Sequence, residues 1–204
     1  MDAGGGFRMV TELLKDYCLI LASHSPRRKE LLSGLDLPYE VRTIPDIDES
    51  YPESLTKDEI PVYIARKKAA AYRPLLLSNE ILITADTIVW LDGKVYGKPA
   101  DETDAIHMLR SLSGHTHEVL TGVCISDTKK EKSFCSISKV KFAELEADEI
   151  TYYVQKYKPY DKAGSYGVQE WIGYIGVESL EGSFYNVMGL PVRMLYRELK
   201  RWKS

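Results

Sequence analysis

Two adjacent arginines begin an expected helix, where positive charge is normally unfavourable. Arg27 and Arg28 follow the apolar run 17–22, and Ser23 and Ser25 lie just before them. The N–H groups at a helix N-terminus already carry partial positive charge, so each exposed cation there costs about 0.3–1 kcal/mol. Two guanidinium groups beside hydroxyls and free N–H groups are typical of a site for a bound anion such as phosphate. A solvated basic face is an equally compatible interpretation of this motif alone.

An acidic side chain interrupts a strongly apolar stretch of the sequence. Asp86 lies in the run 80–91, whose β-branched residues predict a central strand. A carboxylate buried there without a partner is unfavourable, so we expect Asp86 to face a cleft, a metal ion or a cation. The two-residue period of a strand places Thr84 on the same face. A structural ion pair is the weaker alternative, and a requirement for a metal or cation separates the two interpretations.

Other polar residues become candidates only in combination. Lys98 is held in a Gly-Lys-Pro turn, Lys68 lies on an Ala-rich expected helix, and Glu49 belongs to an acidic loop that could bind a metal ion. The stretch 161–169 contains two glycines that permit close backbone approach. Gln169 ends this stretch and offers a donor and an acceptor to the edge of a base. Taken singly, each feature also fits an ordinary turn or a solvated loop.

The elements that must position these residues alternate strands and helices and include one long hairpin. Ser25, Pro26 and Gly34 have the residue types of a helix N-cap, first position and C-terminal stop. Strands are predicted over 17–22, 39–44 and 80–91, two long strands within 116–145, helices over 26–33, 60–72, 101–112, 147–157 and 190–202, and paired short strands over 171–191. This order predicts an α/β fold with a mixed sheet flanked by helices.

Composition limits the classes of protein that the chain can represent. Its 204 residues are 44% hydrophobic, and its formal net charge of -3 gives no general positive field for nucleic acid. Residues 1–16 are expected to be a partly disordered N-terminal extension, and residues 17–204 to form a single domain. The three cysteines form no CxxC pair and are expected to be buried thiols. No signal peptide or membrane span is expected, so we predict a cytoplasmic protein without membrane or nucleic-acid partners.

Eight stretches, taken in order, resemble the Maf family across nearly the whole chain after the extension. They read LASHSPRRKELL, IDES, ARKKA, ADTIV, GKP, LSGHTHEVLTGV, DKAGSYGVQ and GSFYNVMGLP. His24 departs from the family pattern, which usually has a small residue there. The resemblance implies an elongated fold related to inosine triphosphatase-like enzymes, in which a mixed, curved sheet separates two lobes with a central cleft.

The same resemblance implies an activity. Family members hydrolyse nucleoside triphosphates between the α and β phosphates, require Mg²⁺ or Mn²⁺, and often form homodimers. Their proposed proton acceptor falls on Asp86, and their residues for base choice fall on Arg27, Thr87 and Gln169. The branch with Asp-Thr in the central strand is associated with dTTP and UTP, which predicts a pyrimidine substrate for this chain.

We therefore expect one site with three kinds of contact. Phosphate contacts are assigned to Ser23, Ser25, Arg27, Arg28, Lys68 and Lys98, divalent metal binding to Glu49 and Asp86, and contacts to base and sugar to Thr87, Lys162 and Gln169. The alternatives are a non-catalytic nucleotide-binding regulatory protein and a pyrophosphatase for modified purine nucleotides. A nucleic-acid-binding protein is disfavoured by the acidic charge balance.

Overall fold

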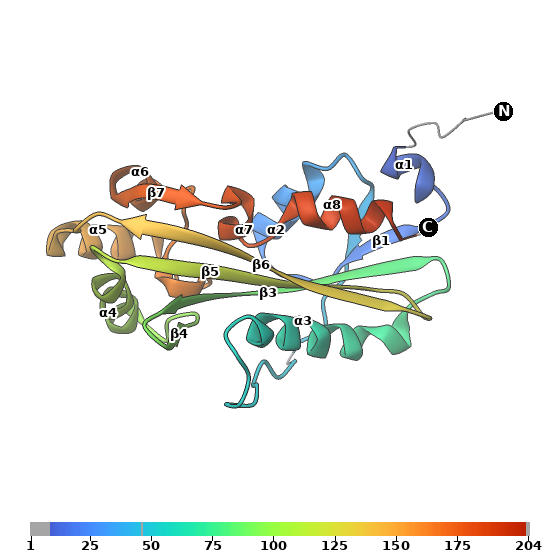
Figure 1. Ribbon diagram of the computed structural model, residues 1–204, viewed down its shortest axis with the longest axis horizontal. Helices are drawn as coiled ribbons and strands as arrows, with labels where there is room; N and C mark the ends of the chain where they lie inside the picture. The colour runs from blue at the N-terminus through green and yellow to red at the C-terminus, as the bar shows by residue number, and fades with distance from the viewer. Residues whose placement is uncertain (1–8, 46, 203–204) are drawn as a thin grey trace.

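The strand predicted around Asp86 is the centre of the fold. β3 spans Glu80–Leu91 and is buried along nearly its whole length. It belongs to a seven-stranded sheet in which six strands follow the order β2-β1-β3-β5-β6-β7 and the seventh, β4, pairs with β3. The computed structural model in Figure 1 describes residues 9–45 and 47–202. The other strands are β1 Cys18–Leu21, β2 Tyr39–Val41, β4 Lys94–Tyr96, β5 Thr116–Ser126, β6 Glu131–Phe142 and β7 Val177–Glu181.

The sheet is mixed, and helices cover both of its faces. β1 runs parallel to β2 and β3, whereas all remaining pairs are antiparallel. The helices are α1 Val10–Leu13, α2 Pro26–Ser33, α3 Glu59–Tyr72, α4 Glu102–Leu112, α5 Ala147–Tyr157, α6 Trp171–Gly176, α7 Phe184–Met188 and α8 Val192–Lys200, with short 3-10 turns η1 Arg73–Leu75 and η2 Ala163–Ser165. In Figure 1, α3 lies below the sheet and α7 and α8 lie above it. The predicted fold class is confirmed.

Alternate residues of the inner strands pack into separate clusters on the two faces. Leu21 and Ile83 belong to the large core that also contains side chains of α4, α5 and α8. Ile20 and Leu82 pack with Ala65 of α3 on the opposite face. This burial on both sides explains why the sequence of β3 is almost continuously apolar rather than alternating.

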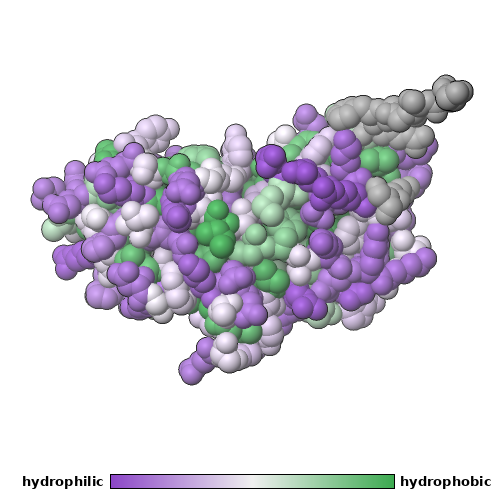
Figure 2. Space-filling view, viewed as in Figure 1, coloured by the Kyte–Doolittle hydropathy of each residue, from purple (hydrophilic) through white to green (hydrophobic). Residues whose placement is uncertain are grey.

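Two lobes are joined by the long strands β3, β5 and β6. One lobe carries α4, α5 and α6, and the other carries α1, α2, α3 and α8, as Figure 1 shows. Most of the surface seen in Figure 2 is hydrophilic, with apolar side chains near its centre and in smaller patches elsewhere. Among the described residues, no helix is long and apolar enough to cross a membrane.

One edge of β3 is divided between two partners, and this division creates the space for a site. Residues 80–83 pair with β1, while residues 89–91 pair with β4. Within the described chain, residues 84–88 have no strand partner on that edge, and Asp86 lies at their centre. Because β4 runs antiparallel to β3, the segments that follow β1 and β4 both lead toward this unpaired stretch.

The helix ends agree with the sequence signals. Ser25 caps α2 by accepting a hydrogen bond from the Arg28 N–H group, Pro26 is the first helical residue, and Gly34 follows the last turn. Asp101 caps α4 in the same way by accepting from the Asp104 N–H group. These caps fix where the two helices begin and thus where the residues of their first turns lie.

The prediction of paired short strands over 171–191 is wrong for most of that segment. It forms helix α6, strand β7 and helix α7, and only β7 pairs with the sheet, on the edge of β6. A Cβ atom at Gly173 would lie only 1.8 Å from the Val168 carbonyl oxygen. This glycine therefore allows the helix to lie close to a neighbouring loop. The Gly-rich composition of the segment had instead indicated turns between strands.

The N-terminal segment contributes to the core. Val10 of α1 is 1% exposed and Leu14 is 5% exposed, and both belong to the large cluster beside α8. The disorder predicted within residues 1–16 remains a prediction for residues 1–8, which lie outside the described residues. The three cysteines are free thiols, and burial raises the pKa of Cys124 to about 12.

Candidate functional site

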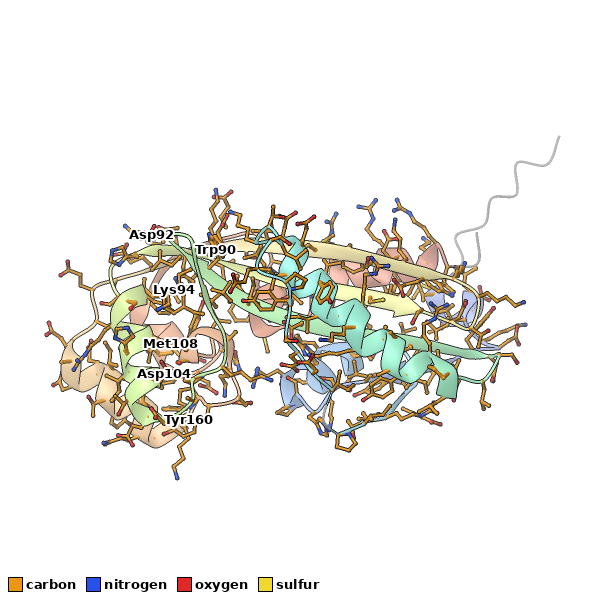
Figure 3. The ribbon with its side chains drawn as sticks, turned by 90° about the horizontal axis from the view of Figure 1, so that it is seen from below. Trp90, Asp92, Lys94, Asp104, Met108 and Tyr160 are labelled. Carbon is orange, nitrogen blue, oxygen red and sulfur yellow. The ribbon has the colours of Figure 1, made fainter. Side chains whose placement is uncertain are left out.

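A cleft with a cavity volume of about 390 Å³ lies at the unpaired stretch of β3. Every residue that the sequence singled out for the site lines it: Ser23, Ser25, Arg27, Arg28, Glu49, Lys68, Asp86, Thr87, Lys98, Lys162 and Gln169. These side chains come from both lobes. Figure 3 labels Trp90, Asp92 and Lys94 at the β3–β4 turn and Asp104 and Met108 on α4, all in the lobe opposite α3.

Asp86 and Glu49 converge on one ammonium group. The Lys68 Nζ atom lies 2.9 Å from Asp86 Oδ1 and 2.9 Å from Glu49 Oε1. Lys98 Nζ lies 3.9 Å from the second oxygen of Glu49. Burial opposes ionisation of Glu49, but the charge and hydrogen bond of Lys68 together with the charges of Lys98 and Arg28 hold the pKa of that carboxyl below its usual range. Asp86 is 9% exposed and forms an ion pair with Lys68, so the acid that the sequence predicts to be buried has a cationic partner.

Glu49 and Asp86 supply only two of the oxygen ligands that a divalent cation needs. No group of three or more His, Cys, Asp or Glu side chains within residues 9–45 and 47–202 could hold a metal ion. Mg²⁺ usually binds one or two protein carboxylates and takes its remaining oxygen ligands from waters and substrate phosphates. Glu49 and Asp86 point to the same place, because both contact Lys68, and they therefore fit such a shared site.

The opposite face of β3 carries a second polar group. Arg28 donates from Nε to the Gly189 carbonyl oxygen at 2.8 Å and from a terminal nitrogen to Thr87 Oγ1 at 3.1 Å. Burial lowers the pKa of Arg28, and the nearby charge of Asp86 opposes this effect. Apolar residues from three elements also line this part of the cleft: Val89, Val119, Val187 and Met188. The cleft thus passes around the edge of β3, from a strongly charged side to a more apolar side.

An ion pair crosses the cleft from α2 to the loop before η2. Arg27 donates to Asp161 Oδ2 at 2.8 Å, and Lys162 donates to the other oxygen of Asp161 at 2.9 Å. Burial alone would raise the pKa of Asp161, but the hydrogen bonds from Arg27 and Lys162 lower it to about 2. The sequence reasoning assigned no role to Asp161. Its position directly before Lys162 was the available signal for a carboxylate that holds cationic side chains in place.

Gln169 has an unused hydrogen-bonding atom. Its Oε1 atom is buried and has no partner in the structure. A buried amide oxygen without a partner costs roughly 1–3 kcal/mol, so such an atom is expected to bind a donor from a ligand. Gln169 lines the cleft, and its contact with the edge of a base stays a prediction.

Tyr166 forms a wall of the cleft that the sequence reasoning missed. Its hydroxyl lies 2.7 Å from Nε2 of His117, and Tyr166, His117 and Phe142 make edge-to-face ring contacts with one another. His117 is 1% exposed, and burial lowers its pKa to about 4. His115, two residues earlier, is exposed, so the two-residue period of a strand does not by itself show that His117 is buried.

This buried histidine predicts a pH-dependent stability. Between about pH 6.5 and about pH 4 the unfolded chain binds a proton at His117 that the folded chain does not bind. The free energy of unfolding therefore contains the whole contribution of this residue above the unfolded pKa. It decreases on acidification, by about 3 kcal/mol at most. We expect His117→Gln to flatten this dependence in urea unfolding at several pH values. His115→Gln, at an exposed position, is the control, and equal slopes for all three proteins would contradict the assignment.

The chain is similar to proteins of one family along nearly its whole length. A family model described as Maf-like protein matches residues 18–202. A dTTP/UTP pyrophosphatase of Bacteroides thetaiotaomicron is 63% identical over 188 residues, covering 92% of this chain and 97% of the relative. A dTTP/UTP pyrophosphatase of Parabacteroides distasonis is 61% identical over 191 residues, covering 94% of this chain and 99% of the relative.

Solved structures share the fold at low sequence identity. The Ham1 protein of Staphylococcus aureus has a TM-score of 0.51 and 19% identity, with 91% of this chain and 100% of that chain covered. A HAM1 protein from Coxiella burnetii has a TM-score of 0.50 and 16% identity, with 91% and 99% covered. These two comparisons support the arrangement of sheet and helices and carry no information on the substrate.

Proposed function

The chain belongs to the family of Maf-like proteins, and from this premise we propose that it hydrolyses pyrimidine nucleoside triphosphates, dTTP and UTP, to the monophosphate and pyrophosphate. The observation that carries the proposal is the meeting of Asp86 with cationic side chains of both lobes in one cleft. A triphosphate brings several negative charges, and catalysis of its hydrolysis depends mainly on positioning and on stabilising charge. Its role in the cell would be to remove these nucleotides from the pool.

The charged side of the cleft is assigned to the triphosphate. Ser23, Ser25 and the first turn of α2 supply hydroxyl and N–H donors, and Arg27, Lys68 and Lys98 supply positive charge. Arg28 lies on the side of Thr87, but it also interacts with the charge of Asp86 and is assigned to the phosphates as well. Lys68 holds Asp86 and Glu49 in position, and both remain available to a divalent cation. When bound, Mg²⁺ or Mn²⁺ would draw charge from the phosphate oxygens. Asp86 accepts a proton from the attacking water, and the α–β phosphoanhydride bond breaks to release pyrophosphate.

The more apolar side of the cleft is assigned to the nucleoside. A uracil-type base presents two carbonyl oxygens beside one N–H group, and a Gln side chain can pair with one acceptor and one donor. The unpartnered Oε1 atom of Gln169 supports this pairing with the N–H group. Lys162, which is 8% exposed, and Thr87 also line the cleft and are assigned to the base and sugar. The methyl group of thymine needs only apolar surroundings, which explains how one site serves dTTP and UTP.

Pyrophosphate release from a panel of nucleotides tests this proposal. We expect turnover of dTTP and UTP with Mg²⁺ or Mn²⁺, little turnover of purine triphosphates, and loss of activity in a chelator that returns when the metal is added back. Nucleotide binding without release of pyrophosphate would indicate a regulatory binding protein instead. Preference for a modified purine nucleotide would replace the proposed substrate but keep the reaction.

Arg27 is expected to contribute mainly to substrate binding. Arg27→Ala removes a guanidinium group that pairs with Asp161 and lines the cleft, so we expect KM for dTTP to rise about tenfold with a smaller change in kcat. Arg193→Ala, at an exposed position on α8 outside the cleft, is the matched control. An unchanged KM in Arg27→Ala would remove Arg27 from the proposed phosphate contacts.

The family resemblance also predicts homodimers, and the composition of the chain predicts action in the cytoplasm without a membrane or nucleic-acid partner. Light scattering on the purified chain tests the dimer, because it gives the molecular mass in solution directly. A monomer at all concentrations would contradict that prediction without affecting the proposed reaction.

A further inference from the structure

We propose that Thr121, a buried residue outside the cleft, fixes the hydroxyl of Thr87 as a hydrogen-bond acceptor and thereby selects substrates that present a donor to it. The proposal rests on the proposed function, because it assumes a nucleotide in the cleft. Thr121 is 0% exposed on β5, directly opposite Thr87 on β3. It would be a positioning residue, since it contacts Thr87 rather than the ligand.

A chain of hydrogen bonds leads from α7 to the cleft. Thr121 Oγ1 donates to the backbone carbonyl oxygen of Asn186 at 3.1 Å, and the hydroxyls of Thr121 and Thr87 are 2.9 Å apart. Arg28 donates to Thr87 Oγ1 at 3.1 Å. Of the two threonines, Thr87 is partly exposed and lines the cleft.

The buried end of this chain is firmly held. Asn186 is 0% exposed, and its Nδ2 atom donates to the Val119 carbonyl oxygen at 3.1 Å and to Ser138 Oγ at 3.0 Å. The Asn186 N–H group donates to Ser183 Oγ at 3.2 Å. The carbonyl oxygen that accepts the hydrogen bond from Thr121 therefore belongs to a residue held by contacts to two strands and to the cap of α7.

Counting protons gives these hydrogen bonds a single direction. A hydroxyl has one proton, and a carbonyl oxygen can only accept, so the proton of Thr121 is used by Asn186. Thr87 must then donate its own proton to Thr121, while Arg28, which has only donors, uses one lone pair of Thr87. Thr87 is left with one free lone pair and no proton. Toward a ligand in the cleft it can act only as an acceptor.

This restriction favours a particular chemistry of the substrate. Uracil and thymine present an N3–H donor, whereas N3 of cytosine has a lone pair in its place. Two facing lone pairs leave both atoms without a hydrogen bond, and a site built for a donor rejects the analogue that lacks it. A ribose hydroxyl is the other donor on these nucleotides that could meet Thr87.

Two substrate ratios measure the effect. The first is kcat/KM for UTP relative to CTP, which reports a base donor, and the second is UTP relative to 2′,3′-dideoxyuridine triphosphate, which reports a ribose donor. If the donor is the base N3–H, we expect Thr121→Val to lower the UTP/CTP ratio about tenfold, because Thr87 can then turn its proton toward N3 of cytosine. If the donor is a ribose hydroxyl, we expect the ratio to the dideoxy nucleotide to fall instead, because Thr121→Val no longer holds the free lone pair of Thr87 toward that hydroxyl. Thr121→Ser keeps the hydroxyl and should preserve both ratios. Thr84→Val removes another buried threonine hydroxyl of the sheet, one that bonds the Ala65 carbonyl oxygen on the α3 side, and serves as the matched control.

The outcomes separate this proposal from the proposed function. Unchanged ratios in Thr121→Val, or equal use of all three nucleotides by the unaltered chain, would overturn it; Thr121→Ala provides the same comparison if the valine variant does not fold. If the unaltered chain releases no pyrophosphate, the proposed function fails. Dissociation constants of the corresponding α,β-methylene nucleotides then give the same two ratios without turnover and decide the role of Thr121.

Discussion

Asp86→Asn is expected to lower kcat for pyrophosphate release by on the order of 10³-fold, with the fold retained. Asparagine has nearly the same shape but cannot take the proton of the attacking water, and it binds a divalent cation more weakly than a carboxylate does. Lys68 would keep Glu49 as its ionic partner, so the variant leaves no cation without a counter-ion. The measurement is single-turnover and steady-state release of pyrophosphate from dTTP with saturating metal.

A matched control exists on the same strand–turn unit. Asp92 follows β3 in the exposed turn before β4 and has a positive φ of 48°, a conformation that asparagine adopts readily. Asp92→Asn should therefore keep full activity and stability. Turnover by Asp86→Asn within about threefold of the unaltered chain, where the loss of a general base should cost 10²–10⁴-fold, would exclude Asp86 as the proton acceptor.

Gly173→Ala is expected to destabilise the protein by about 3 kcal/mol or more, against the usual preference of helices for alanine. In an open helix this change stabilises by about 1 kcal/mol, because alanine has the higher helix propensity. Here the new Cβ atom would lie 1.8 Å from the Val168 carbonyl oxygen and 2.7 Å from its carbonyl carbon. Since both are backbone atoms, α6 and the loop must move apart. Gln169 follows Val168 directly, so we also expect weaker binding of dTTP.

Urea unfolding monitored by circular dichroism measures the loss of stability. Gly97→Ala is the control, because a Cβ atom there meets nothing within 4 Å and Gly97 has no positive φ. Its unfolding free energy should change by less than about 0.5 kcal/mol. Equal stability of Gly173→Ala and the unaltered chain would show that α6 can shift without cost and would contradict the close approach.

The sequence was most informative where a residue type opposed its local surroundings. Asp86 in an apolar strand and Arg27 at a helix N-terminus are locally unfavourable, and both line the cleft. The start of α2 could be predicted because Ser25 acts on the neighbouring backbone of its own helix. In each case the physical reason lies within a few residues of the chain.

Features that depend on distant partners could not be predicted in this way. The Arg27–Asp161 ion pair joins residues 134 positions apart. The environment of His117 depends on its contact with Tyr166, which is also distant in the sequence. The helix at 171–176 was missed because its glycines serve contacts with Val168 and Leu145, which composition cannot show. The roles assigned to the cleft residues remain predictions until the variants are measured.

The division of the β3 edge between β1 and β4 has a consequence for how the protein moves. β1 belongs to one lobe and β4 to the other, and neither spans residues 84–88. A hinge motion that separates the lobes there need not break a backbone hydrogen bond on this edge, while the ladder with β5 stays intact on the other. Opening of the cleft for nucleotide entry would then leave the amide protons of the β3–β5 ladder protected from deuterium exchange. The two lobes could separate without unfolding of the sheet.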